Sequence, residues 1–377
     1  MRKKCFLHLG YDNKFYSGSI KSYNNIDGIT NRFFVYKEKP KGPLKYLKGY
    51  ESLITCCEKT QLINEIRMGD YDVFIIHSLS FHCWDIFKGI PKDKIVVWQS
   101  YGFDIYSPGP FGIDYKLIQI DSLLPITKKV FKESRTLLLS IKYYFAYIIL
   151  NFRWRRLGRK IVERVNYFQP VFHLEYELLS KLPYFKAKEY YPPQFNPRWG
   201  DFSEEPKQDR MGAIQLCNSA GEYGNHLDVW EIVKKFISTQ QEVIIPLSYG
   251  DKGYASYVRT IVKDDHDKTT ILEDFIPRED YFEMMNRSTY FVHGALRQHA
   301  MANVYNAIAA GRKVFLFKSS LIYRHLTDIG CLVFPIEEIN SKSFQTPLTV
   351  EEHNRNIDAL KNMIKQRQDN RSFQELN

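Results

Sequence analysis

The sequence predicts an α/β protein built from two Rossmann-like, doubly wound domains in succession. Short apolar runs such as VFIIH and IVVWQ alternate with helical patterns, which is typical of parallel strands covered on both faces. This alternation stops at a charged stretch without apolar periodicity, residues 201–210, and then starts again. A length of 377 residues also favours two domains over one.

The first half, residues 1–200, is predicted to form the N-terminal domain. A mixed strand and helix segment covers residues 50–68, and a helix is expected near residues 175–182. Consecutive prolines in YYPPQFNP exclude a helix over residues 190–197. The expected strands are residues 5–9, 32–36, 73–77, 95–99 and 165–169.

The second half, residues 201–377, is predicted to form the C-terminal domain. Its most informative part runs from Tyr290 to Phe317 and reads as strand, loop, helix, glycine stop and second strand. The amphipathic tail at about residues 349–367 is predicted to be a helix, and it is a candidate to pack back on the first domain. The other expected strands are residues 213–219, 242–248 and 269–275, and the other expected helices are residues 227–239, 254–262 and 278–286.

The positive charge is concentrated in one segment. The formal net charge is +10, and residues 115–164 hold twelve Lys or Arg against three Asp or Glu. The same segment contains an apolar, aromatic run at 137–152, shorter than the roughly 20 residues that span a bilayer. Two interpretations stay open: a helix that docks on an anionic membrane surface, and a buried helix beside a solvated basic face. No recognised motif supports nucleic-acid binding.

The N-terminus and the cysteines predict a cytoplasmic protein. The first residues lack an apolar signal-peptide core and a small-residue cleavage site. Six cysteines without C-x-x-C spacing are typical of reduced thiols and predict no structural zinc. Without a D-x-D motif at a strand end, no metal site is predicted.

Two loops of the second half carry candidate binding residues. Arg297 and Gln298 lie directly before a predicted helix, where free N–H groups and the helix dipole attract an anion. An ordinary structural loop is the alternative. Asn218 and Ser219 end a predicted strand and His226 begins a helix, which fits a phosphate-contacting turn that has neither Walker nor G-x-G-x-x-G spacing.

Three polar residues follow strands of the first half. Asp12 is presented just after the first strand, where a carboxylate can act as a general base or, alternatively, cap a helix. His77 ends one strand, and Asp104 follows the next in WQSYGFDIY. Either residue is a candidate to bind or orient an acceptor sugar, and the alternative for each is a hydrogen bond within its loop.

Taken in order, these motifs resemble a known family. They are GxD after the first strand, WxxxGxDxY from Trp98 to Tyr106, NS with a downstream His, PxxY ending at Tyr249, and ALRQHA closing with Ala310-Gly311. The chain resembles the TDP-N-acetylfucosamine:lipid II transferases, also called TDP-4-acetamido-4,6-dideoxygalactose transferases. Each motif is short, so the weight lies in their order across nearly the whole chain.

The resemblance implies a GT-B fold, with two Rossmann-like domains facing a central cleft, and inverting, metal-independent glycosyl transfer in surface polysaccharide synthesis. It implies a TDP-linked donor in the second domain, no cofactor besides this nucleotide sugar, and a polyprenyl-diphosphate-linked saccharide acceptor at the inner membrane face, to which the enzyme would bind peripherally through residues 115–164. The chain departs from the family in residues 107–164, which are longer here, and at His299. Carried over, Asp12 is base or acceptor orienter, His77 and Asp104 lie on the acceptor side, and Asn218, Ser219, Tyr249, Arg297 and Gln298 surround the donor.

One further position concerns the nucleotide. Many GT-B enzymes have a Glu in a motif like E-A-x-A-x-G that binds both ribose hydroxyls, and the matching segment here begins with Asn306. The loss of charge is hypothesised to suit the deoxyribose of TDP. A helix-surface Asn without a ligand is the alternative.

Two other functions compete with glycosyl transfer. A GT-B-fold enzyme of other chemistry, such as a sugar-nucleotide epimerase or a pyruvyl transferase, would not need the basic segment. A non-catalytic protein that binds a membrane surface or a polyanion would not need polar residues at strand ends in both halves.

Overall fold

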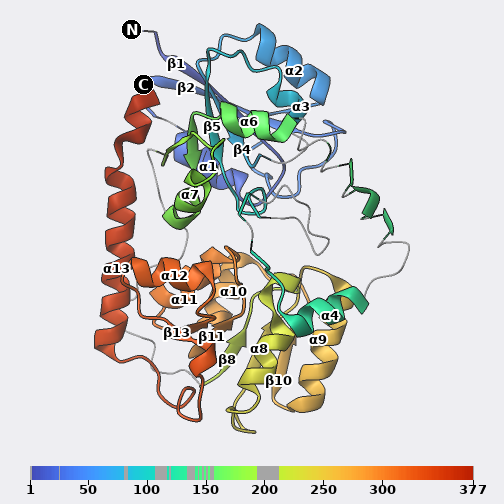
Figure 1. Ribbon diagram of the computed structural model, residues 1–377, viewed down its shortest axis with the longest axis vertical. Coiled ribbons are helices and arrows are strands. Elements are labelled where there is room, and N and C mark those ends of the chain that lie inside the picture. The colour runs from blue at the N-terminus through green and yellow to red at the C-terminus, as the bar shows by residue number, and fades with distance from the viewer. Residues whose placement is uncertain are drawn as a thin grey trace. The chain divides into compact units, whose positions relative to one another are not determined.

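The computed structural model describes residues 2–24, 26–79, 84–106, 117–118, 120–133, 141–142, 144–146, 148–149, 152, 157–192 and 212–376 (Figure 1). The chain divides into two compact units. Unit 1 comprises Met1–Gln119, Tyr143–Asn196 and Ile364–Asn377, and unit 2 comprises Ile120–Lys142 and Pro197–Met363. The charged stretch predicted as a linker, 201–210, lies outside the described residues.

This division differs from a single boundary at residue 200. Ile120–Lys142, part of the basic segment assigned to the first domain, belongs to unit 2, and Ile364–Asn377 belongs to unit 1. The basic segment 115–164 is therefore shared between the units. The physical reason is the packing of helix α4 (Pro125–Glu133), whose buried Phe131 lies edge-on against Tyr254 of unit 2.

Unit 1 is built on a parallel sheet with the order β3-β2-β1-β4-β5-β6-β7. The predicted strands at 73–77 and 95–99 have the same bounds in the structure, because both are runs of β-branched and aromatic residues buried along most of their length. The strands are β1 (Lys4–Gly10), β2 (Ile29–Tyr36), β3 (Ile54–Cys57), β4 (Val73–His77), β5 (Ile95–Gln99), β6 (Tyr167–Gln169) and β7 (Lys188–Glu189). The helices are α1 (Tyr16–Tyr23), α2 (Lys59–Met68), α3 (Trp84–Phe87), α6 (Arg159–Arg164) and α7 (His173–Ser180).

Residues from distant parts of the sequence complete the core of unit 1. Phe6 of β1 packs with Phe373, whose ring centroid lies 6.1 Å away, and Leu376 is fully buried in the same cluster. Lys4 Nζ donates to the carbonyl of Leu376 at 2.8 Å. Both C-terminal residues belong to the 3-10 helix η4 (Arg371–Leu376), which follows α13 (Val350–Asp369).

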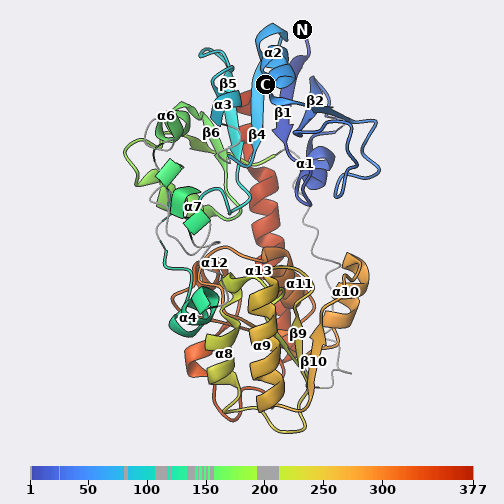
Figure 2. The same ribbon diagram turned by 90° about the vertical axis from the view of Figure 1, so that its right-hand side faces the viewer.

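Unit 2 has a second parallel sheet, with the order β10-β9-β8-β11-β12-β13. Helices α8 and α9 cover one face, and α11 and α12 cover the other (Figures 1 and 2). The strands are β8 (Ile214–Leu216), β9 (Val243–Pro246), β10 (Thr269–Leu272), β11 (Tyr290–His293), β12 (Lys313–Leu316) and β13 (Phe334–Pro335). The helices are α8 (His226–Val233), α9 (Lys252–Asp265), α10 (Arg278–Met285), α11 (Met301–Ala309) and α12 (Leu321–Asp328), with 3-10 turns η2 (Glu222–Gly224) and η3 (Ile336–Glu338).

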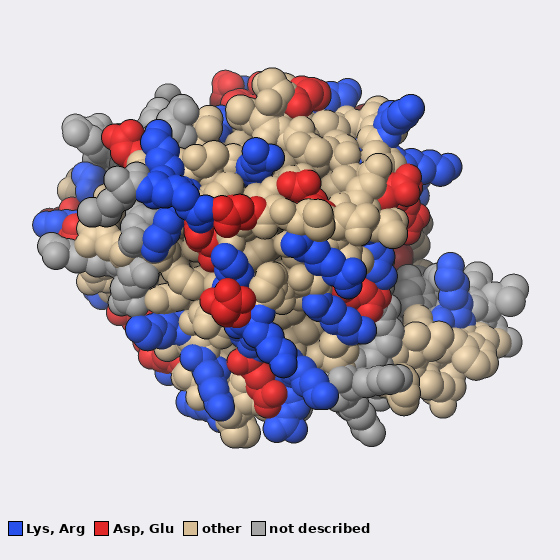
Figure 3. All heavy atoms as spheres, turned by 90° about the horizontal axis from the view of Figure 1, so that it is seen from above, with Lys and Arg blue, Asp and Glu red and all other residues tan. Residues whose placement is uncertain are grey.

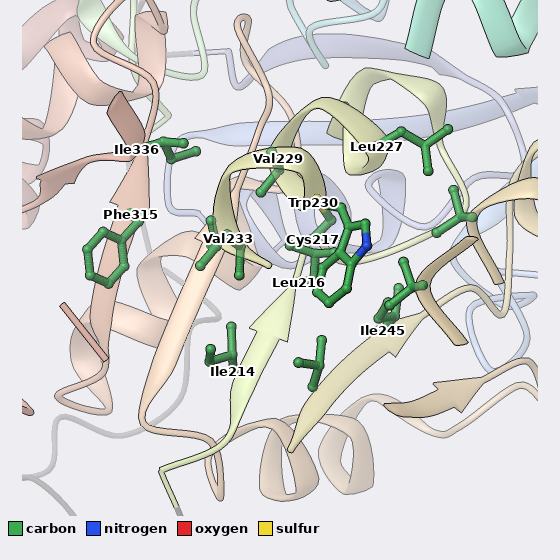
Figure 4. Packing of buried hydrophobic residues seen from close by; sticks show 14 of the residues in the cluster. Ile214, Leu216, Cys217, Leu227, Val229, Trp230, Val233, Ile245, Phe315 and Ile336 are labelled. Atoms are coloured by element: carbon green, nitrogen blue, oxygen red, sulfur yellow. The ribbon is translucent and has the colours of Figure 1, made fainter. Parts of the chain in front are cut away.

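The core of unit 2 lies between β8 and α8 (Figure 4). Trp230 and Val233 on α8 are fully buried, and they pack with Ile214 and Leu216 of β8. All residues of the neighbouring strands β9 and β11 are buried and most of them are apolar, which explains why these strands read as continuous apolar runs and not as alternating patterns. This core fixes the end of β8, where the candidate residues follow.

Basic side chains lie beside acidic ones over the face shown in Figure 3, so the positive charge is not gathered into a field of one sign there. Within the described residues, no helix is both long and apolar enough to cross a bilayer.

Candidate functional site

The topology of unit 2 points to one place on its sheet. The strand order reverses between β8 and β11, since the chain leaves β8 for β9 on one side and later adds β11 on the other. Ligands of open parallel sheets bind at such a switch point, outside the carboxyl ends of the strands. The β8–α8 loop carries Asn218 and Ser219, and the β11–α11 loop carries Arg297 and Gln298. The structure thus places these four predicted residues on the two loops of one switch point.

Asn218 is held beside a neighbouring loop with one polar atom unused. Its Nδ2 donates to the hydroxyl of Tyr249 at 3.1 Å, so the structure brings these two predicted residues together. Asn218 is only 3% exposed, and its Oδ1 has no hydrogen-bond partner among the described residues. Buried polar atoms are nearly always paired in native proteins, so an unpaired one at a switch point indicates a ligand or an ordered water. Tyr249 is half exposed and can contact the same ligand.

Arg297 lies over an aromatic ring of the opposite loop. Its guanidinium carbon is 4.0 Å from the ring centroid of Tyr223, and Nη1 donates to the carbonyl of Gln298 at 3.2 Å. The side chain is 6% exposed. A guanidinium that stacks by one face directs its N–H donors outward in its own plane, the geometry in which arginine binds phosphate oxygens. Arg297 is therefore held rigidly at the switch point.

The backbone of the β11–α11 loop is prepared for an anion as well. Its carbonyls at Gly294, Ala295 and Leu296 accept from Asn225 Nδ2, Ser320 Oγ and the Leu321 N–H at 2.8, 2.6 and 3.0 Å. These carbonyls are engaged inside the unit, while the first N–H groups of α11 follow at the other end of the loop. The predicted sequence of strand, loop, helix, glycine and strand is confirmed, with Ala300 at φ 54° directly before the helix.

His226 lies inside the unit at the start of α8, beneath the β8–α8 loop. It is fully buried, its Nδ1 lies 3.4 Å from the hydroxyl of Tyr254, and burial lowers its pKa to about 3. A Cβ at Gly224 would lie 2.8 Å from its ring, so this position requires glycine. His226 therefore packs under the β8–α8 loop, and its predicted contact with the donor stays a prediction.

Asn306 lies on α11 beyond the switch-point loop. It is 5% exposed, and it makes interactions within the unit. Its backbone carbonyl accepts from the Ala310 N–H at 2.9 Å, as in any helix. The predicted contact with a ribose stays a prediction.

Sequence reasoning missed three residues of this region. Tyr223 stacks on Arg297, and Asn225 joins the two loops through its bond to Gly294. Phe275 follows β10 at the same edge of the sheet and is 87% exposed, an unusual position for a large aromatic side chain. Asn225 had a usable signal: a non-glycine residue at φ 50° is most often Asn, and the preceding Gly224 marks a tight turn.

In unit 1, the strand order reverses between β1 and β4, which places Asp12 and His77 at its switch point. The carboxylate of Asp12 accepts the backbone N–H groups of Lys45, Tyr46 and Leu47 at 2.6, 3.0 and 3.1 Å. Asp12 therefore anchors the β2–β3 loop and does not cap a helix. Its role as a base stays a prediction.

His77 is the centre of a buried chain of hydrogen bonds. The carbonyl Oδ1 of Asn31 can only accept, so His8 Nε2 donates to it, at 2.9 Å. His8 Nδ1 must then accept from His77 Nε2 at 3.0 Å, and His77 Nδ1 accepts from Tyr101, 3.4 Å away. Burial lowers the pKa of His8 to about 3 and that of His77 well below its ordinary value. Both rings are neutral and fully occupied, so the predicted acceptor contact of His77 has no support in this arrangement.

Asp104 is fully engaged within unit 1. Burial raises the pKa of Asp104, against the hydrogen bonds that lower it. Two donors on each oxygen fill the lone pairs of a carboxylate, so the arrangement is that of a structural residue that ties the β5 loop to the β4 loop. Its predicted acceptor role stays a prediction. The four donors are the N–H of Leu79, Trp98 Nε1, Ser100 Oγ and the N–H of Tyr101, at 2.9, 2.6, 3.0 and 3.1 Å.

The apolar part of the basic segment exposes its large side chains. The described residues between 141 and 152 are helical. Large side chains recur there every three or four residues, as on one helical stripe. All of them are exposed, by 46% to 64%, and they are Ile141, Tyr144, Phe145, Ile148, Ile149 and Phe152. The interpretation of a buried helix is wrong for these side chains.

Within the described part of the chain, no group of three or more His, Cys, Asp or Glu side chains is arranged to hold a metal ion.

No protein-family model matches the sequence, and a search of curated proteins finds no significant relative. Solved structures do match over nearly the whole chain. HepE of Anabaena, in complex with UDP and glucose, has a TM-score of 0.62 at 11% identity and covers 97% of this chain and 96% of its own. The trehalose-phosphate synthase of Burkholderia vietnamiensis has a TM-score of 0.58 at 9% identity, covering 97% and 98%. An Escherichia coli trehalose-6-phosphate protein bound to UDP-2-fluoro glucose has a TM-score of 0.57 at 11% identity, and the match covers 97% of this chain and 97% of its own. At such identities the likeness shows the fold, which is GT-B.

Proposed function

We propose that this chain is a glycosyltransferase that binds a nucleotide-diphosphate sugar at the switch point between β8 and β11 of unit 2. The observation that carries the proposal is the pair of loops there, with the rigid Arg297 and the unpaired, buried Oδ1 of Asn218. A diphosphate needs cationic and N–H donors, and a sugar or nucleoside hydroxyl needs an acceptor. Both are present at one edge of the sheet. Two of the similar structures hold UDP or a UDP-sugar, which supports the same ligand class.

In its specific form, the proposal is inverting transfer of a (dideoxy)amino sugar, such as N-acetylfucosamine, from TDP to a polyprenyl-diphosphate-linked saccharide. The acceptor oxygen forms a bond to the anomeric carbon while the bond from that carbon to the β-phosphate oxygen breaks. The departing TDP keeps the bonding electrons, and its charge is met by Arg297 and the start of α11. The proton of the acceptor hydroxyl passes to a carboxylate, for which Asp12 is proposed.

Nucleotide binding tests the proposal directly. Thermal shift and calorimetric titration with TDP, UDP and GDP should show stabilisation by one of them, since a specific ligand stabilises the folded state by mass action. TDP is expected to bind better than UDP. A preference for UDP would contradict the role proposed for Asn306 and leave the class of donor intact.

A matched pair of arginine variants locates the site. Arg297→Ala should weaken nucleotide binding by about ten- to a hundred-fold, the usual worth of one or two charge-assisted contacts. Arg287 lies after α10 and its side chain is 76% exposed, so Arg287→Ala is the control and should bind as the native protein does. Equal binding by the two variants would refute the site. Turnover of a TDP-sugar only without an acceptor would favour an epimerase.

We further propose that residues 141–152 dock on an anionic membrane surface, where a polyprenyl-linked acceptor resides. A stripe of exposed aromatic and branched side chains, with the exposed Lys142 among them, suits the boundary between headgroups and acyl chains. Flotation with vesicles that contain phosphatidylglycerol should carry the protein upward, and vesicles of phosphatidylcholine should do so less.

Changing Tyr144, Phe145, Ile148 and Ile149 together to Ser should abolish flotation without loss of thermal stability, since all four are exposed. Nucleotide binding by this variant is the control for its fold. Unchanged flotation would exclude this segment as the membrane contact.

A further inference from the structure

Helix α4 is an integral part of unit 2, although it is far from the rest of that unit in sequence. The carboxylate of Asp228 accepts the N–H groups of Ile126 and Thr127 at 3.0 and 2.8 Å and so caps the first turn of α4. Asn225 Oδ1 accepts the Leu124 N–H at 2.8 Å. Asn225 and Asp228 lie at the start of α8, so α4 is fixed beside the β8–α8 loop.

Helix α4 has a buried face and a second side that carries lysines. Its buried residues are Thr127, Val130 and Phe131, which face α8 and α9. Lys132 follows Lys129 by three residues and Lys128 by four, so these three lysines gather on another side of the helix. Lys128 is paired with Asp121 at 3.0 Å. In the described part of the chain, Lys129 and Lys132 have no ion-pair partner.

These lysines line an open pocket of about 790 Å³. Its apolar wall is formed by Leu123, Leu124 and Pro125 before and at the start of α4, and by Leu296 of the β11–α11 loop. Asp121 and Glu133 complete the lining. Leu296 directly precedes Arg297, so the pocket adjoins the candidate nucleotide site within the same unit.

We propose that this α4 pocket binds the diphosphate group and the first isoprenoid units of the polyprenyl-linked acceptor, an inference that rests on the proposed glycosyl transfer. Two unpaired ammonium groups attract a multiply charged oxyanion, and the leucines offer a surface to a hydrocarbon chain. A free sugar would need neither. An acceptor held by its diphosphate here would contact Leu296, which directly precedes Arg297 in the same loop.

The test uses the full chain and a water-soluble probe, farnesyl diphosphate, with farnesol and inorganic diphosphate as its two halves. The native protein should bind farnesyl diphosphate more tightly than either half. Lys129→Ala/Lys132→Ala should weaken this binding by about ten-fold or more and raise the KM for the acceptor by a similar factor. The affinity for TDP should stay unchanged. Lys129→Arg/Lys132→Arg keeps the charge and should restore most of the affinity.

The matched control is Lys263→Ala/Lys268→Ala, two exposed lysines of the same unit, of which Lys263 lies in the last turn of α9 and Lys268 directly before β10. If the control variant loses as much affinity for farnesyl diphosphate as the α4 variant does, binding at the α4 pocket is refuted. Equal binding of farnesol refutes the role of the phosphates, and equal competition by phosphatidylglycerol vesicles shows a lipid-headgroup site instead.

Failure of the pocket and failure of the proposed function give different results. Binding of TDP that depends on Arg297, with an acceptor KM unaffected by the α4 variant, leaves the transferase and removes the pocket. Binding of farnesyl diphosphate that depends on Lys129 and Lys132, without binding of any nucleotide, removes the transferase and overturns the identification of the ligand as its acceptor.

Discussion

The two sheets of this protein share a topology, but the candidate residues that follow their strands differ in how well their own polar groups are satisfied. In unit 1, His8 and His77 form a closed chain of hydrogen bonds with Asn31 and Tyr101, and Asp104 accepts four more. In unit 2, Asn218 keeps a buried oxygen without a protein partner. A satisfied network stabilises a fold, whereas an unsatisfied one leaves capacity for a ligand. Polar residues after a strand therefore do not by themselves indicate a site.

The largest expected effect is on turnover, and it concerns Asp12, the residue of unit 1 that is proposed to act as the general base. Asp12→Asn should lower turnover by about a hundred- to ten-thousand-fold, the usual contribution of a general base. Stability should fall by about 1 kcal/mol, because the amide oxygen can still accept the N–H groups of Tyr46 and Leu47 while that of Lys45 loses its acceptor. TDP affinity, which unit 2 provides, should not change.

Asp27→Asn, in an exposed loop of unit 1, is the control for the loss of one negative charge. If Asp12→Asn keeps its turnover, Asp12 serves only as an anchor, and unit 1 supplies no base at this position.

Asp104 should show how much the closed network of unit 1 contributes to stability. Asp104→Ala leaves four donors without an acceptor, including the indole of Trp98 and the hydroxyl of Ser100. The expected loss is about 3 kcal/mol in the free energy of unfolding, measured by urea titration. A loss of unfolding free energy no larger than that of a substitution at an exposed position would contradict this. It would mean that water can hydrogen-bond to the four donors in place of the carboxylate.

Two asparagines compare the switch points directly. Asn31 bonds to His8 and to the carbonyl of Tyr23, at 2.9 and 2.6 Å, and Asn31→Ala should cost about 2 kcal/mol of stability. Asn218→Ala removes one bond to the half-exposed Tyr249 and should cost less than about 1 kcal/mol, while it weakens nucleotide binding. If both variants lose the same stability and Asn218→Ala binds the nucleotide as the native protein does, Asn218 has the same structural role as Asn31.

An effect that the two units share is sensitivity to acid. Burial lowers the pKa of His8 and His226 to about 3 and that of His293 to about 4. The unfolded chain then binds more protons than the folded chain below about pH 6.5, so stability is complete above that pH and falls as the pH falls. The slope is about 1.4 kcal/mol per pH unit for each such histidine.

Urea unfolding between pH 7.5 and 5.5 measures this slope. His8→Gln in unit 1 and His226→Gln in unit 2 should each flatten it by a similar amount. The buried Glu175, whose pKa burial raises to about 7, acts in the opposite sense, since the folded state then holds the extra proton. A slope of zero would mean that the histidines are solvated.

The sequence predicted the fold well because its signals are local. Strands β4 and β5 are apolar except for their last residues, His77 and Gln99, and the segment from β11 to β12 has Gly294 and Gly311 at its turns. The positions of the candidate residues at strand ends followed from the same pattern. Their partners did not: Asp12 meets a loop 33 residues later, and Asp228 caps α4 across 101 residues at Thr127. Such contacts depend on the tertiary fold, and the spacing of apolar residues in the sequence does not predict them.

The C-terminal part of unit 1 has a consequence for the order in which the protein folds during synthesis. Phe373 and Leu376 complete the core around Phe6, and both follow every residue of unit 2 in the chain. A ribosome releases all of unit 2 before it releases these two side chains, so unit 2 can close while the sheet of unit 1 waits with part of its apolar surface exposed to water. During that interval the apolar residues around Phe6 lack the two side chains that cover them in the folded protein.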